Sequence, residues 1–201
     1  MTPRRGRRST RLSDWWKLTA GPDHEQGDLL FHLPVATESA IAIAGDDVTV
    51  TSRVDWIDAV ILTQTCDLAN AKLPTVLVAR VLPWSTFAEA QFDAGNQAVM
   101  SKGYINALLR GDLPPLALLH ERTAAPELPW SVVDFRVVYS IQRSRLDDVV
   151  AQPGSKQRLR LVSPYKEHFA QAFARFFMRV GLPHDAAGFV QAGRQQVAHL
   201  R

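Results

Sequence analysis

The chain has 201 residues, of which 46% are hydrophobic and 21% charged, with a formal net charge of +3. This composition can fill a core without disulfides or structural metals, and it excludes a mainly disordered protein. Cys66 is the only cysteine, so an internal disulfide is excluded. No apolar run approaches about eighteen residues and no signal-peptide pattern is present, so we expect no membrane span and a cytoplasmic location.

Charge is unevenly distributed along the chain. Residues 1–11 carry five arginines and no acid, residues 12–135 carry seven basic and sixteen acidic residues, and residues 136–201 carry eleven basic and four acidic residues. Clustered positive charge attracts nucleic acid or an acidic protein surface, which are the partners we expect. Neutralisation of the basic last third by the acidic middle is the alternative.

The first half of the chain predicts mainly strands. Residues 1–12 have almost no apolar content and predict a disordered basic tail, followed by a single α+β domain over residues 13–201. Gly27–Pro34 predicts a strand stopped by its proline. Ala59–Thr63 is apolar at consecutive positions, which predicts a strand buried on both faces, and Thr75–Leu82 predicts a second buried strand that runs back beside it.

The second half combines helices with strands. Residues 85–111 predict a helical insertion, interrupted at Gly95 and closed by Gly111 as a C-cap. Alternating strands are predicted at Ser131–Ile141 and Arg158–Val162, with a loop over residues 147–156. Ser163 and Pro164 signal the start of a C-terminal helical pair over about 164–199. Its first helix, Tyr165–Val180, is also a candidate homodimer surface if Phe177 and Met178 are exposed.

Three segments appear in an order that is shared with a known family: Gln26-Gly27-Asp28-Leu29, then Ala59-Val60-Ile61-Leu62-Thr63, then Val76-Leu77-Val78-Ala79-Arg80-Val81. This layout, over Gln26–Leu82, resembles the SH3-like barrel of PemK and MazF toxins. The resemblance implies an endoribonuclease or an inactive relative that binds. We therefore expect an α+β fold, with a strongly bent sheet or an SH3-like barrel at its centre.

The chain departs from this family where the catalytic residues usually stand. Ile57 and Asp58 occupy the place of the family's arginine, and Leu82-Pro83-Trp84 separates the returning strand from Ser85 and Thr86. An aspartate at that place would repel a phosphoryl group instead of stabilising it. The usual ribonuclease site is therefore expected to be missing, although Arg53 stands in the preceding loop as a substitute.

Thr65, Cys66 and Asp67 form the most unusual polar cluster, at the exit of the buried strand. Cys66 is a candidate nucleophile for a hydrolase if a base activates it. The adjacent Asp67 opposes formation of the thiolate, and no histidine is close in sequence. Because free cysteines are usually buried, a buried structural turn is the favoured interpretation.

Arginines supply the candidate binding surface. Arg136, Arg158 and Arg160 are predicted on the exposed sides of neighbouring strands, with Arg143 and Arg145 on a loop beside them, and Arg53 is a sixth candidate for binding nucleic acid or a partner. No sequence spacing typical of a metal site is present, and neither a metal nor a cofactor is expected. We therefore expect a non-catalytic module that binds nucleic acid or a protein, with a divergent ribonuclease or Cys66-dependent hydrolase as the alternative.

Overall fold

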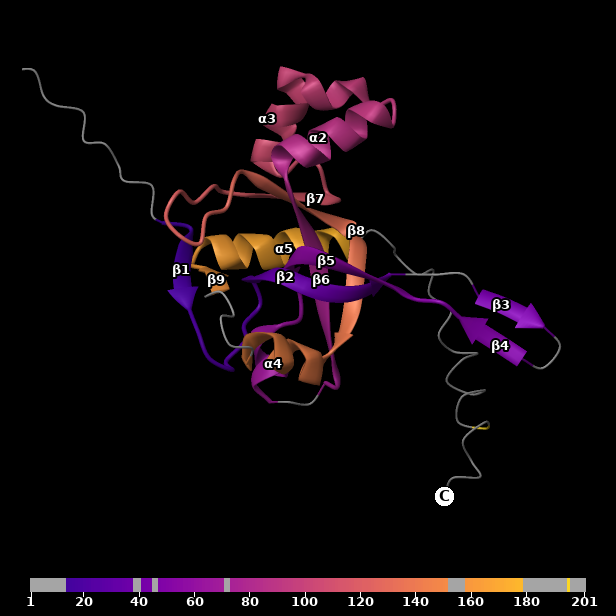
Figure 1. Ribbon diagram of the computed structural model, residues 1–201. Helices are drawn as coiled ribbons and strands as arrows, with labels where there is room; N and C mark the ends of the chain where they lie inside the picture. The colour runs from indigo at the N-terminus through magenta and orange to yellow at the C-terminus, as the bar shows by residue number, and fades with distance from the viewer. Residues whose placement is uncertain are drawn as a thin grey trace, which may run out of the picture.

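The computed structural model describes residues 14–37, 41–44, 47–70, 73–151, 158–178 and 195. The strands are β1 (Trp16–Thr19), β2 (Asp28–Thr37), β3 (Ile41–Ala44), β4 (Asp47–Val50), β5 (Arg53–Ile61), β6 (Thr75–Pro83), β7 (Leu116–Leu119), β8 (Ser131–Gln142) and β9 (Arg158–Leu161). The helices are α1 (Thr65–Ala69), α2 (Trp84–Asp93), the 3-10 turn η1 (Gln97–Met100), α3 (Lys102–Arg110), α4 (Arg143–Ala151) and α5 (Tyr165–Phe177). Figure 1 shows their arrangement.

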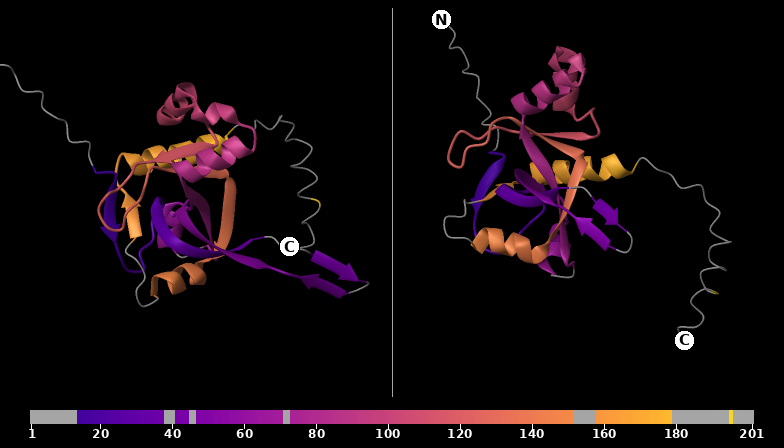
Figure 2. Two further views of the ribbon diagram at one scale, coloured as in Figure 1. Left: turned by 45° about the horizontal axis from the view of Figure 1, so that its top comes forward. Right: turned by 45° about the vertical axis from the view of Figure 1, so that its right-hand side comes forward.

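Seven of the strands form one antiparallel sheet in the order β1-β9-β2-β5-β6-β8-β7, and β3 and β4 form a separate pair. The sheet bends strongly (Figure 2). Among the described strands its edges, β1 and β7, do not pair with each other. The indole of Trp16 nevertheless donates a hydrogen bond to the carbonyl oxygen of His120, just after β7, at 2.9 Å. The predicted α+β class is confirmed, but the sheet is open and does not close into a barrel.

Helices cover both faces of this sheet. On one face, Phe169 of α5 packs into a cluster with Val60 and Leu62; on the other, Leu146 of α4 packs into a cluster that contains Ile61. Consecutive residues of a strand point to opposite faces, so apolar side chains are needed at every position where both faces are covered. This explains the buried apolar run, although the strand that contains it already begins at Arg53.

The helical segment between β6 and β7 forms a third apolar cluster with β7 and β8. Ser101 caps α3, because its hydroxyl accepts a hydrogen bond from the backbone N–H of Tyr104 at 3.1 Å. Gly111 ends the helix in the left-handed conformation, with φ of 71°. Helices therefore lie where the sequence predicts the insertion. None of the helices in the described part of the chain is long and apolar enough to cross a lipid bilayer.

Several predicted boundaries differ from the structure. β2 continues through Pro34 to Thr37. A proline is tolerated at this place because β9 pairs with β2 only at Asp28 and Leu29, so the side of the strand that faces away from β5 needs no backbone N–H donor here. Helix α4 occupies residues 143–151, where part of the predicted loop lies, and α5 begins at Tyr165 with Pro164 as its N-cap. The predicted tail at 1–12, the end of the helix at 179–180 and, except for residue 195, the second helix lie outside the described residues.

Candidate functional site

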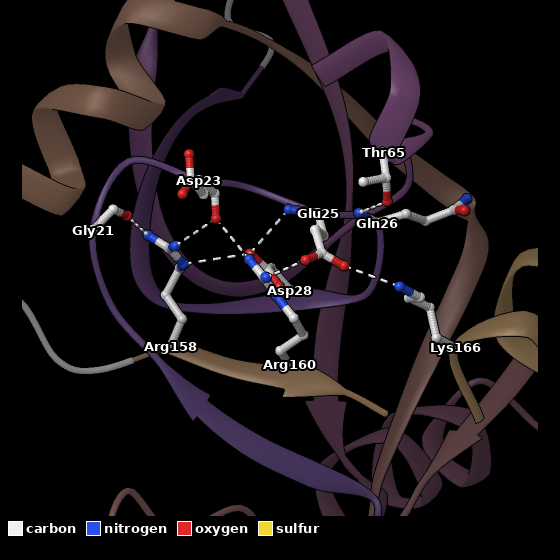
Figure 3. A network of polar contacts seen from close by, with 9 residues as sticks. All are labelled: Gly21, Asp23, Glu25, Gln26, Asp28, Thr65, Arg158, Arg160 and Lys166. Carbon is white, nitrogen blue, oxygen red and sulfur yellow. Dashed lines mark hydrogen bonds and ion pairs between the residues drawn. The ribbon is translucent and has the colours of Figure 1, made fainter. Parts of the chain in front are cut away.

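Arg158 and Arg160 are buried, and the prediction that they form an exposed basic face is wrong. Their side chains are 3% and 7% exposed. The alternation of arginine and leucine in β9 suggests an edge strand with a solvated side, but β9 lies between β1 and β2 and all four of its residues are buried. The two guanidinium groups point into a network of acidic side chains and carbonyl oxygens (Figure 3).

Arg160 binds Asp28, whose side chain is 0% exposed, with two hydrogen bonds. The Nε and Nη2 atoms of Arg160 donate to Oδ1 and Oδ2 of Asp28 at 2.5 and 2.8 Å. Nη2 also donates to the carbonyl oxygen of Asp23 at 2.6 Å, and Nη1 donates to Glu25. The hydrogen bond to Asp28 raises the pKa of Arg160. The guanidinium is thus held by charge-assisted bonds within the protein.

Arg158 completes this network from the same strand. It donates to the carbonyl oxygens of Gly21 and Asp23 at 2.7 and 3.0 Å, and its Nε lies 3.4 Å from Oδ2 of Asp28. Burial lowers the pKa of Arg158. Both arginines therefore fix the loop that precedes β2, and neither presents a guanidinium to a phosphate in solution.

Glu25 extends the network to α5. The Nζ atom of Lys166 donates to Glu25 Oε2 at 2.9 Å, and this hydrogen bond lowers the pKa of Glu25. Strand β9, the loop before β2 and the first turn of α5 are therefore joined by charged groups. The arrangement has the properties of a structural clamp.

His24 is buried beside this clamp. Its side chain is 2% exposed, and its Nε2 lies 3.5 Å from Oδ1 of Asp147, which is too long for a strong hydrogen bond. Burial, followed by the charge of Arg158, lowers the pKa of His24 to about 4, although Asp28 and Asp147 act in the opposite direction. The imidazole is consequently neutral at pH 7.

Thr65, Cys66 and Asp67 begin the short helix α1, next to the loop that the arginines hold. The backbone N–H of Gln26 donates to Oγ1 of Thr65 at 3.2 Å, which ties the start of α1 to this loop. Cys66 is exposed, so the prediction that it is buried is wrong. The reason is that Leu68, rather than Cys66, is the residue of α1 that points into the core.

No activating group contacts the thiol among the residues that the structure describes. In the described part of the chain, its polar contacts are with Oε1 of Gln64 at 3.6 Å and Oδ1 of Asp67 at 3.9 Å. An amide oxygen and a carboxylate do not stabilise a thiolate as a histidine or an arginine would. The described part of the chain therefore places no base at hydrogen-bonding distance from the Cys66 thiol.

Replacing Cys66 with serine is expected to change the free energy of unfolding by less than about 0.5 kcal/mol, since surface substitutions away from special features are nearly neutral. Urea denaturation followed by tryptophan fluorescence measures this change. The matched control is Leu68→Ala in the same helix, which removes a side chain that is 3% exposed and should cost about 2–5 kcal/mol. Equal losses in the two variants would contradict the exposed position of Cys66.

The four remaining candidate arginines lie on three elements, β5, β8 and α4. Arg136 is 52% exposed and forms an ion pair with Asp134 at 2.6 Å; Arg53 is 76% exposed and forms one with Asp55 at 2.7 Å. Arg143 donates to the carbonyl oxygen of Leu68 at 2.6 Å. Arg143 and the exposed Arg145 belong to α4 rather than to a loop. The six arginines thus do not form one exposed basic face.

An exposed apolar surface lies on β4 and β5 and is not predicted from the sequence. We call the side chains of Val48, Val50, Val54 and Trp56 the apolar ribbon; they are 61%, 61%, 55% and 55% exposed. In the sequence, the only sign of this surface is the alternate spacing of these apolar residues, and such spacing suggests a strand whose apolar side faces the core. Instead, β3 and β4 project away from the sheet (Figures 1 and 2).

A stacked pair of rings stands at one end of this ribbon. The ring centroids of His32 and Trp56 are 4.6 Å apart, at an interplanar angle of 16°. His32 lies at an irregularity of β2 and has a φ of 57°, the left-handed region that side chains other than glycine rarely adopt. Its backbone N–H donates to Oδ1 of Asp58 at 2.9 Å, which holds it there.

A separate apolar groove of 220 Å³ lies between the helical insertion and β7. Its lining consists of Trp84, Ile105, Leu108, Leu109, Leu118 and Trp130. These side chains offer no acid, base or nucleophile. The described residues also contain no group of three or more histidine, cysteine or acidic side chains that could hold a metal ion. No known family model matches this chain, and no curated protein matches its sequence.

Proposed function

We propose that this chain is a non-catalytic binding module that contacts another protein through the apolar ribbon. The observation that carries the proposal is the exposure of all four side chains by more than half. Single exposed apolar residues are normal on protein surfaces, whereas a contiguous group marks an interaction site. A protein is favoured over nucleic acid because Arg158 and Arg160 are buried and Arg136 is paired with Asp134.

Trp56 is the expected anchor of this contact. Large aromatic side chains dominate the energetics of protein interfaces because they bury much area with little loss of conformational freedom. The left-handed backbone of His32 costs on the order of 1–3 kcal/mol, and such strain gathers at functional positions. Asp58 supports it and so keeps the imidazole stacked on the indole.

The other expectations stay predictions. They are the relationship to PemK and MazF toxins with an SH3-like barrel, the binding of nucleic acid, the cytoplasmic location and the alternative of a divergent ribonuclease or Cys66-dependent hydrolase. A dimer through α5 has some support, because Phe177 and Met178 are 59% and 78% exposed. The alternative of a Cys66-dependent hydrolase has less support than this dimer, since no described base contacts the Cys66 thiol.

The test is photo-crosslinking from position 56. Trp56 is replaced by the photoreactive amino acid p-benzoylphenylalanine, the variant is expressed in its source cells, and the cells are irradiated. We expect discrete adducts that protease removes and nuclease leaves intact, and we expect Val54→Asp to reduce them. The same photoreactive residue at Phe92, an aromatic side chain of α2 that is 50% exposed, is the control. Nuclease-sensitive adducts, or equal adducts from both positions, would contradict the proposal.

A further inference from the structure

We propose that His24 makes the contact between α4 and the loop before β2, residues 20–27, sensitive to acid. When the imidazole binds a proton, it moves toward Asp147 and solvent, and the loop and α4 separate. Neither residue belongs to the apolar ribbon, so this opening is independent of the proposed function. Its basis is the burial of His24, the charges that face the ring and the way in which α4 is held.

His24 is buried without a hydrogen bond. Its side chain is 2% exposed, and neither Nδ1 nor Nε2 has a hydrogen-bond partner among the described residues. Buried polar groups in folded proteins are nearly always hydrogen-bonded, so a ring without such a partner is an exception that needs a physical reason. The neutral ring is therefore held in place by packing, and a protonated ring, which carries two donors, needs acceptors that its buried position does not supply.

Charges on three elements face the imidazole. Burial and then the charge of Arg158 in β9 lower the pKa of His24, while Asp28 in β2 and Asp147 in α4 act in the opposite direction. Asp28 is already occupied, because it accepts two hydrogen bonds from Arg160 and lies 3.4 Å from Nε of Arg158. Asp147 lies 3.5 Å from Nε2 of His24, and its side chain is 50% exposed. An imidazolium is thus repelled by Arg158 and attracted toward Asp147 and solvent.

Two hydrogen bonds hold the beginning of α4. The backbone N–H of Arg143 donates to the carbonyl oxygen of Pro74 at 2.9 Å, and its Nη1 donates to that of Leu68 at 2.6 Å. Asp147 lies about one turn further along the helix, where it meets the loop. A separation that turns about Arg143 therefore leaves the start of α4 in place. It uncovers Leu146, which is 0% exposed in the closed state.

Hydrogen–deuterium exchange of the full chain, followed by mass spectrometry, tests this opening. The pKa of His24 is about 4 in the closed state, against 6.5 for the ordinary group, so the open state binds a proton that the closed state does not. Between pH 7 and 4.5 we expect the protection factors of residues 20–27 and 143–149 to fall roughly 50-fold. Exchange of both segments should be insensitive to urea up to about 1 M, because a local opening exposes little surface, whereas exchange of β5 and β6 should accelerate.

Two variants identify the group that responds to acid. His24→Leu should reduce the fall in both segments to about two-fold or less, the part that Glu25 of the same loop can still contribute at pH 4.5. His168→Gln removes an exposed histidine of α5 and should leave the fall unchanged. A fall that persists in His24→Leu would overturn the assignment to His24.

The wild-type protein alone decides whether the opening is local. If residues 20–27 and 143–149 lose protection together with β5 and β6, with the same dependence on urea, acid acts by global unfolding and the proposal is wrong. This comparison holds even if His24→Leu does not fold. Crosslinking from position 56 is unaffected by either result, so the failure of this proposal and the failure of the binding function are separate outcomes.

Discussion

Replacing Arg160 with methionine should lower the free energy of unfolding by about 3–5 kcal/mol, because removing one partner of a buried ion pair leaves an uncompensated charge. The charge left behind is that of Asp28, whose side chain is 0% exposed and accepts two hydrogen bonds from Arg160. Glu25 and the carbonyl oxygen of Asp23 lose a donor as well. Chemical denaturation at pH 7 measures the loss.

Arg136→Met is the matched control for this experiment. Arg136 also binds an aspartate with more than one hydrogen bond, but it is 52% exposed, so its loss should cost only about 0–1 kcal/mol. The double variant Asp28→Asn/Arg160→Met should recover part of the stability, since it removes the orphaned charge. Similar losses in the two single variants would show that burial does not distinguish the two ion pairs.

Acidification should destabilise the protein through His24. Its pKa is about 4 in the folded protein, against 6.5 for the ordinary group, so between these values the unfolded chain binds a proton that the folded chain does not. The contribution of His24 to the free energy of unfolding is therefore complete above pH 6.5. It is lost as the pH falls toward 4, by about 3 kcal/mol in total. Glu25, whose pKa is lowered mainly by Lys166, adds a loss in the same direction at lower pH.

Denaturation midpoints between pH 7 and 4.5 isolate the contribution of His24. His24→Leu should flatten this dependence, because the variant has no group at this position to titrate. His168→Gln removes an exposed histidine of α5 and should leave the dependence as it is in the wild-type protein. A wild-type stability that is constant over this range would mean that the buried imidazole accepts a proton as easily as it does in the unfolded chain.

Patterns that depend on neighbouring residues predicted much of the fold. The consecutive apolar residues from Ala59 to Ile61 lie in a strand with both faces covered, and Gly111 caps a helix as its position suggests. These predictions hold because the spacing of apolar side chains and the backbone freedom of glycine act over a few residues. Boundaries near Pro34 and Arg143 were wrong, since strand pairing and helix packing by distant residues decide them.

The burial and the partners of the candidate site residues depend on contacts between residues far apart in the sequence, which no local pattern contains. In β9 the alternation of arginine and leucine is correct as a strand signal, but the partner that makes burial of Arg160 possible is Asp28, 132 positions earlier in the chain. Without a carboxylate in reach, burial of the guanidinium would be prohibitively costly, and an exposed position is the reasonable prediction. Cys66 shows the converse, because an apolar setting was expected and the thiol is exposed.

By itself, therefore, the sequence determined the α+β class, the central buried strand and the position of the helical insertion, because each follows from residues close together in the chain. Only the tertiary structure decided whether the arginines of β9 and the apolar side chains of β4 and early β5 are buried. It buries Arg158 and Arg160 against the acidic loop before β2 and leaves Val48, Val50, Val54 and Trp56 exposed on a projecting ribbon. The physical reason is that the cost of burying a charge, or of exposing an apolar side chain, depends on which distant groups the fold brings to it.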